Sequence, residues 1–268
     1  MNLSAYTSID CRVCGEENLK PWKFVFGSRT KSMVAVYSCK HCYSFFTNPQ
    51  LYLSRDKKQN WEHGIDYFLK REHISKQYSK MYLQHLVNDN AVNKRYLDIG
   101  CGIGWSLIEA QQMGFAEVHG VEPIHQVAQY AKDKLGLNVI NDYFRRDQYQ
   151  EDYFDLIMAN QVLEHVEAPK EMLLNALRIL KPGGLLMINI PPFDWLRLAL
   201  YKLNMSSSRR INVFYAPEDH INYFSPKSFD VLTHKTNSIL LGQFHWNKFR
   251  KVVQPWLNLS TGSFLITK

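Results

Sequence analysis

Paired cysteines are the first group of residues in the chain whose spacing could support chemistry. Cys11 and Cys14 form one C-x2-C pair, and Cys39 and Cys42 form a second pair after 24 intervening residues. Two such pairs can present four thiolates to one tetrahedral ion, with Zn–S bonds of about 2.3 Å. The alternative, two structural disulfides, is disfavoured in a reducing compartment. The spacing therefore predicts a structural zinc site.

A glycine-rich segment is the second such group. An apolar run ends in Asp98 and leads into Gly100, Gly102 and Gly104, after which a helix is expected. Glycines remove Cβ atoms, and a helix N-terminus offers free N–H groups, so a ligand can approach the backbone closely. A dinucleotide-binding loop, G-x-G-x-x-G, would need glycine where this chain has Trp105. The motif therefore favours a ligand without a pyrophosphate.

Glu122 ends the next predicted strand, where a carboxylate can accept hydrogen bonds from both ribose hydroxyls of an adenosine. This pairing of a glycine motif with Glu122 resembles the class I S-adenosylmethionine-dependent methyltransferases. Residues 141–142, 154–166 and 180–185 resemble three further segments of that family in the right order. The resemblance implies S-adenosylmethionine as cofactor, bound by Asp98, Gly100, Gly102, Gly104, Glu122, Asp142, Asn160 and Gln161.

Hydrophobic periodicity predicts the elements that position these residues. Alternating strands and helices from Lys94 onward indicate a parallel α/β sheet. Strands are expected at Tyr96–Ile99, Glu117–Val121, Asn138–Ile140, Phe154–Ala159, Leu185–Ile190, Leu240–His245 and Ser263–Thr267. Helices are expected at Trp105–Gln112, His125–Leu135, Pro169–Leu180 and Pro226–Thr236. The resemblance implies a Rossmann-like, mostly parallel sheet of seven strands in the order 3-2-1-4-5-7-6.

The chain before this sheet has a different character. Short strands at Trp22–Phe26 and Met33–Tyr37 suggest a two- or three-stranded zinc ribbon, and helices interrupted at Gly64 are expected over residues 61–90. We therefore expect a zinc-ribbon module at 1–50, a helical linker or cap at 51–93, and a methyltransferase domain at 94–268. Residues 191–225 are expected to form an acceptor lid within that domain.

Histidines are the expected acceptor-side residues. Methyl transfer requires an aligned nucleophile, and an alcohol acceptor also needs a base. His165 and His220 are the candidates, with Tyr223 as a third, although a lone histidine is often purely structural. Some ubiquinone-type O-methyltransferases bind a divalent ion through E-x-x-E-H. This chain has Gln161-x-x-Glu164-His165, so we predict no catalytic metal.

The flanking segments point to a class of acceptor. Phe45–Pro49, Asp66–Phe68 and Glu218–Pro226 resemble segments of bacterial methyltransferases from sugar and surface-polysaccharide pathways. The net charge of +7 lies entirely in residues 1–95, which hold 15 Lys and Arg against 8 Asp and Glu. We expect this charge to attract a phosphorylated or nucleotide-linked sugar, although lysines can also simply solvate a surface.

Two alternative functions remain open on sequence alone. Some RNA methyltransferases carry an N-terminal zinc module, but this basic part has no dense Lys/Arg stripe. A non-catalytic zinc-dependent scaffold is a second alternative, disfavoured by the intact glycine motif. The composition, 46% hydrophobic and 21% charged, is that of a globular protein. With no apolar run long enough for a membrane helix and no signal peptide, we expect a cytoplasmic protein without a membrane partner.

Overall fold

The structure is a computed structural model that describes residues 8–27, 32–47, 64–87, 91–191, 220–245 and 262–268. The chain divides into two compact units. The first unit comprises Met1–Asp56, Leu163–Lys170 and Ile190–Phe264, and the second comprises Lys57–Val162, Glu171–Asn189 and Leu265–Lys268. No helix among the described residues has the length and apolar character needed to cross a membrane.

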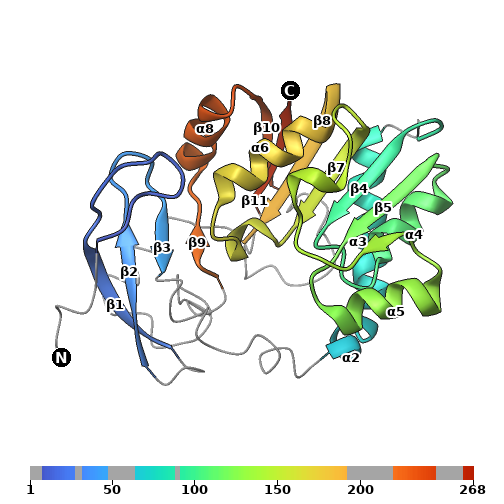
Figure 1. Cartoon of the computed structure of the whole chain (residues 1–268), viewed down its shortest axis with the longest axis horizontal. Helices are drawn as coiled ribbons and strands as arrows, with labels where there is room; N and C mark the ends of the chain where they lie inside the picture. Colours follow the sequence, from blue (N-terminus) through green and yellow to red (C-terminus); the bar gives the residue numbers. More distant parts are fainter. Residues whose placement is uncertain (1–7, 28–31, 48–63, 88–90, 192–219, 246–261) are drawn as a thin grey trace. The chain divides into compact units, whose positions relative to one another are not determined.

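A seven-stranded sheet has the order β10-β11-β8-β7-β4-β5-β6 (Figure 1). Its strands are β4 (Arg95–Ile99), β5 (Glu117–Val121), β6 (Val139–Ile140), β7 (Phe154–Asn160), β8 (Leu180–Ile190), β10 (Ile239–His245) and β11 (Gly262–Thr267). The pairs β4–β5, β4–β7, β5–β6 and β7–β8 are parallel. Counted along the chain from β4, the order is 3-2-1-4-5-7-6, so the predicted Rossmann-like sheet is confirmed.

The register of the central strands gathers polar residues at one edge of the sheet. Ile99, which ends β4, lies opposite Val121, which ends β5, and opposite Ala159 near the end of β7. The buried middle of β7, Leu156–Ala159, and that of β8, Leu186–Ile188, are apolar, as expected where helices cover both faces of a parallel sheet. Polar side chains at the carboxyl ends of these strands are therefore expected to contact a ligand rather than the core.

The helices of the described chain follow the predicted periodicity closely. They are α2 (Gly64–Leu69), α3 (Glu72–Val87), α4 (Trp105–Gln112), α5 (His125–Leu135), α6 (Pro169–Ile179) and α8 (Pro226–Lys235), with short 3-10 helices η3 (Arg146–Gln148) and η4 (Leu163–His165). The expected interruption at Gly64 falls at the border of the described residues, because residues 61–63 are not described and α2 starts at Gly64. A break between α2 and α3 falls at residues 70–71.

A second sheet lies in the first unit, with the order β1-β2-β3-β9. It consists of β1 (Pro21–Gly27), β2 (Ser32–Ser38), β3 (Phe45–Thr47) and β9 (Asn222–Tyr223), all paired antiparallel. The sequence suggested two or three strands here and did not include β9, which comes from the far end of the chain. Of the expected lid, residues 192–219 lie outside the described residues.

Candidate functional site

The glycine loop after β4 has a backbone that only glycine fits. Gly102 has φ +57°, and a Cβ atom there would lie 2.6 Å from Cε1 of Phe68 on α2. Gly100 has φ +73°, and a Cβ atom there would lie 2.6 Å from Cγ2 of Val162. Phe68 and Val162 therefore pack directly on the loop, a contact that the sequence did not reveal. Because neither residue is polar or regularly spaced from the motif, no local sequence signal indicates it.

Asp98 is buried at the end of β4, with one carboxylate oxygen satisfied and the other not. Its Oδ2 accepts a hydrogen bond from Ser106 in the first turn of α4. Its Oδ1 has no hydrogen-bond partner among the described residues. Burial raises the pKa of Asp98 to about 7. A buried carboxylate oxygen without a partner is costly, so it fits a cationic donor such as the ammonium group of S-adenosylmethionine.

Glu122 joins the end of β5 to the glycine loop. Its Oε2 accepts a 2.9 Å hydrogen bond from the Gly102 N–H, and its Oε1 accepts one of 2.9 Å from the Ile124 N–H. The side chain is buried, and burial raises its pKa. Each carboxylate oxygen can accept a further hydrogen bond, so Glu122 can hold the loop and also bind ribose hydroxyls.

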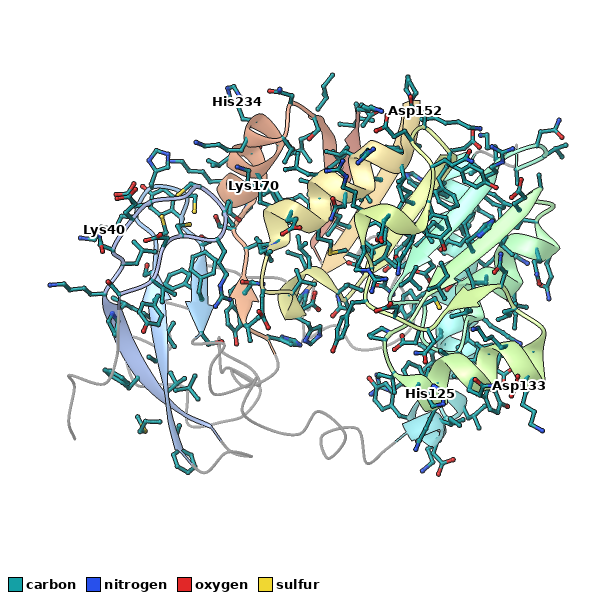
Figure 2. All side chains as sticks on the ribbon, viewed as in Figure 1. Lys40, His125, Asp133, Asp152, Lys170 and His234 are labelled. Atoms are coloured by element: carbon teal, nitrogen blue, oxygen red, sulfur yellow. The ribbon has the colours of Figure 1, made fainter. Side chains whose placement is uncertain are left out.

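The two residues that follow β6, Asn141 and Asp142, make different contacts. Asn141 donates a 3.0 Å hydrogen bond to the Glu122 carbonyl, and its Oδ1 lies 2.8 Å from Nδ1 of His125, labelled at the start of α5 in Figure 2. The predicted contact residue Asp142 instead forms an ion pair with Arg145, with 2.5 Å between Oδ2 and Nη1. Asn141 is thus the residue linked to the Glu122 backbone, and the role of Asp142 toward adenine stays a prediction.

Asn160 and Gln161 lie at the end of β7, where a buried residue of β8 holds both. Asn189 donates a 2.7 Å hydrogen bond to Oδ1 of Asn160, and its carbonyl accepts one of 2.7 Å from the Gln161 N–H. The amide of Asn189 also lies 3.3 Å from the Tyr82 hydroxyl of α3. Sequence reasoning missed Asn189, although one polar residue within the apolar run of β8 was a usable signal.

The four paired cysteines converge in the first unit. The Sγ atoms of Cys11 and Cys42 are 3.5 Å apart, as are those of Cys14 and Cys39, and all four lie within 4.8 Å of one another. None forms a disulfide. A tetrahedral zinc ion with 2.3 Å bonds requires sulfur separations of about 3.8 Å. The donor set therefore fits a zinc ion, and Lys40, labelled in Figure 2, lies exposed beside it.

Both cysteine pairs use the same backbone turn. The N–H of Gly15 donates to the Cys11 carbonyl, and the N–H of Tyr43 donates to the Cys39 carbonyl, each at 2.9 Å. Gly15 has φ +80° and Tyr43 has φ +56°. Tyr43 therefore adopts the left-handed conformation that usually favours glycine. The ammonium group of Lys227 lies 4.6 Å from the centre of its ring.

The two candidate histidines also lie together in the first unit. The ring centroids of His165 and His220 are 4.9 Å apart at an interplanar angle of 78°, and Tyr223 lies 6.5 Å from His220. Glu164 is buried beside them, with Oε1 3.8 Å from Nε2 of His165. Neither of its oxygens has a hydrogen bond among the described residues, and burial raises its pKa to about 8. The ligand atoms of Glu164, His165 and His220 lie within 4.8 Å of one another, a grouping that sequence reasoning did not assemble.

Comparisons with known proteins support the fold and the family. Residues 56–238, more than half of the chain, match the family described as "Methyltransferase domain". The ubiquinone biosynthesis O-methyltransferase of Bradyrhizobium sp. (strain ORS 278) is 32% identical over 110 residues, which are 40% of this chain and 43% of that protein. The protein of the same name from Pseudomonas fluorescens (strain Pf0-1) is 33% identical over 102 residues, 35% and 43% of the two chains. The match thus spans less than half the length of these curated relatives.

Two solved structures share the fold at low sequence identity. One chain comes from the complex between the Haloferax volcanii Trm112 methyltransferase activator and a methyltransferase, with a TM-score of 0.54, 14% identity and coverage of 75% of this chain and 94% of that one. The other is magnesium protoporphyrin IX methyltransferase from Synechocystis PCC 6803 with bound SAH, with a TM-score of 0.51, 15% identity and coverage of 72% and 83%. The chain belongs to the methyltransferase-domain family and has the class I S-adenosylmethionine-dependent methyltransferase fold.

Proposed function

We propose that the chain transfers a methyl group from S-adenosylmethionine to a small-molecule acceptor. The observation that carries this proposal is the pair of buried carboxylates at the carboxyl ends of β4 and β5, on either side of the glycine loop. Asp98 offers an unpartnered oxygen, and Glu122 already orients the loop through the Gly102 N–H. S-adenosylmethionine supplies a sulfonium methyl group that a nucleophile can displace in line.

The two carboxylates divide the binding task. Asp98 pairs with the ammonium group of the methionine part, because that contact satisfies its buried Oδ1. Glu122 accepts from the ribose hydroxyls while keeping its two backbone hydrogen bonds. Asn160 and Gln161, held by Asn189, complete the predicted cofactor contacts. Pre-organisation of this kind lowers the entropic cost of aligning the methyl group.

On the acceptor side, His165 and His220 are the bases we propose. Imidazole changes charge near neutral pH, which suits proton removal from a hydroxyl group. Oε1 of the buried Glu164 lies 3.8 Å from Nε2 of His165, so this carboxyl group faces the imidazole ring. Tyr223 is the weaker candidate, because a phenol has an ordinary pKa near 10 and keeps its proton at neutral pH.

A small, anionic, sugar-derived compound is the acceptor class that we propose. Two observations support it: the excess positive charge of residues 1–95 and the flanking segments similar to sugar methyltransferases. The curated relatives are named for ubiquinone biosynthesis, which supports a small acceptor methylated on oxygen. We also propose that the four-cysteine cluster binds structural zinc, which would help to hold together the short strands β1, β2 and β3 around it.

Calorimetry with S-adenosylmethionine tests the cofactor part of the proposal. Glu122→Gln removes the charge that the ribose hydroxyls would meet, and we expect affinity to fall about 10- to 100-fold. Glu171→Gln, on the exposed face of α6, is the matched control and should bind like the wild type. Equal binding by the Glu122 variant, or no binding by the wild type, would refute the proposed cofactor site.

Methyl-labelled S-adenosylmethionine tests the acceptor part. Incubation with fractionated cell metabolites and with total RNA should place the label in an anionic small-molecule fraction. Labelling of RNA alone would instead select the RNA methyltransferase alternative, and so would binding that weakens steeply with added salt.

A further inference from the structure

Arg12 lies between the two cysteines of the first pair, and its guanidinium group contacts segments that are distant in the sequence. Its Nη1 donates a 3.1 Å hydrogen bond to the Ile221 carbonyl and one of 2.9 Å to Oδ1 of Asn222. Its Nη2 donates a 3.0 Å hydrogen bond to the Thr47 carbonyl at the end of β3. One guanidinium group therefore links the first cysteine pair to β3 and to Asn222 of β9, which is 210 residues further along the chain.

The partners of Arg12 in turn hold the segment that carries Glu164 and His165. The amide of Asn222 donates to the carbonyls of Leu163 and Val166, at 3.1 Å and 2.6 Å. The Ile221 N–H donates to the Glu164 carbonyl at 2.8 Å. Asn222 is buried, so its amide has no water to replace a lost protein partner. Both ends of η4 are thus fixed to β9.

His220 directly precedes Ile221 and Asn222, the two neighbouring residues that Arg12 contacts. Thr47, whose carbonyl accepts the hydrogen bond from Nη2 of Arg12, also donates its own N–H to the Ile221 carbonyl at 3.0 Å. The backbone on one side of His220 and the backbone on both sides of His165 are therefore set by one group of hydrogen bonds. All these residues belong to the first unit.

We propose that Arg12 is a positioning residue that couples the cysteine cluster to the His165–His220 pair. In this role the cysteine cluster does more than stabilise its own sheet, because it fixes the backbone of Arg12, whose side chain orients the segments that carry the two proposed bases. The inference rests on the proposed function only in treating His165 and His220 as bases. The structural coupling between Arg12 and these histidines can be measured without an acceptor.

Arginine is required here by the shape of its side chain. The two terminal nitrogens serve two chain segments at once, whereas the single ammonium of lysine is a point donor on a flexible stem. Arg12→Lys keeps the charge but cannot reach Thr47 and Asn222 together. Asn222→Asp complements it, because the carboxylate still accepts from Arg12 but repels the Leu163 and Val166 carbonyls.

The test compares zinc-loaded full-length proteins by NMR of 13C-labelled histidines. The signals of His165 and His220 are assigned with single His→Gln variants. We expect both signals to shift in Arg12→Lys and in Asn222→Asp, with zinc content unchanged. Arg178→Lys, which alters an exposed ion pair with Glu151 on the second unit, is the matched control and should leave them in place.

Cofactor binding and turnover separate this proposal from the proposed function. Affinity for S-adenosylmethionine should stay within about twofold of wild type in both variants, while kcat for a labelled acceptor falls about 100-fold, as expected for a misplacement near 1 Å. If Arg12→Lys loses zinc, Asn222→Asp carries the test, since it leaves the cysteine pairs intact. Unchanged histidine signals in a zinc-loaded variant would overturn the coupling. Failure of the wild type to bind S-adenosylmethionine would overturn the proposed function alone.

Discussion

Asp98→Asn should change the stability of the protein by an amount that depends on pH and that increasingly favours the variant as the pH rises. The pKa of Asp98 is about 7 in the folded chain, against an ordinary value of 3.8. The folded state therefore favours the protonated acid, and wild-type stability falls as the pH rises from about 4 through about 7. The ionisation penalty on the free energy of unfolding is about 1.7 kcal/mol at pH 5 and about 4 kcal/mol at pH 8.

Asparagine has nearly the same shape and no charge, so it escapes this penalty. Its amide N–H2 would occupy the place of Oδ1, where no partner is described, and this costs about 1 to 3 kcal/mol at every pH. The difference in unfolding free energy between variant and wild type should therefore shift by about 2 to 3 kcal/mol in favour of the variant between pH 5 and pH 8.

Urea denaturation followed by far-UV circular dichroism, at several pH values from 5 to 8, measures this difference directly. Asp133→Asn, an exposed change on α5 (Figure 2), is the control for the loss of one surface carboxylate. The variant should also bind S-adenosylmethionine much more weakly, so stability and binding change in opposite directions at pH 8. A stability difference that stays constant with pH would refute the claim that Asp98 carries a buried, uncompensated charge.

Three further predictions follow from the same structure. Gly102→Ala should lower the melting temperature and cofactor affinity more than Gly114→Ala does. Both glycines have a positive φ, which costs an alanine about 1 to 2 kcal/mol, but only a Cβ atom at position 102 would contact Phe68. Equal effects of the two substitutions would exclude that contact. Cys39→Ser should abolish binding of one zinc per chain, measured by metal analysis, and retention of full zinc content would rule out the four-cysteine site. Turnover should not depend on magnesium, because Gln161 replaces a carboxylate; activity lost with EDTA and restored by magnesium, but not by zinc, would contradict this.

The sheet and the glycine loop were predictable because their signals are local. Apolar runs that alternate with helical periodicity predict where the strands of the parallel sheet lie. Helices α4 and α5 begin and end at the predicted residues. The four cysteines were likewise visible from spacing alone. In each case the residues that act together are near neighbours in sequence or repeat at a regular interval.

The parts that sequence analysis missed depend on contacts between distant segments. β9 is a two-residue strand whose pairing with β3 has no periodicity to detect. Asn189 and Arg12 gain their importance from partners in other elements, because a buried amide or guanidinium is recognisable only when its partners are known. Phe68 and Val162 contact the glycine loop through packing alone, which composition does not encode.

The pairing of β3 with β9 also constrains when the antiparallel sheet can be completed during synthesis of the chain. When Arg12 leaves the ribosome, its partner at Ile221 is still 209 residues away. At about 5 to 20 residues per second, this is an interval of about 10 to 40 s. During that time β3 presents an open edge, and edges of this kind are prone to pair with other chains. The cysteine cluster is complete by residue 42, so early metal capture would give the nascent chain a folded core while it awaits its last strand.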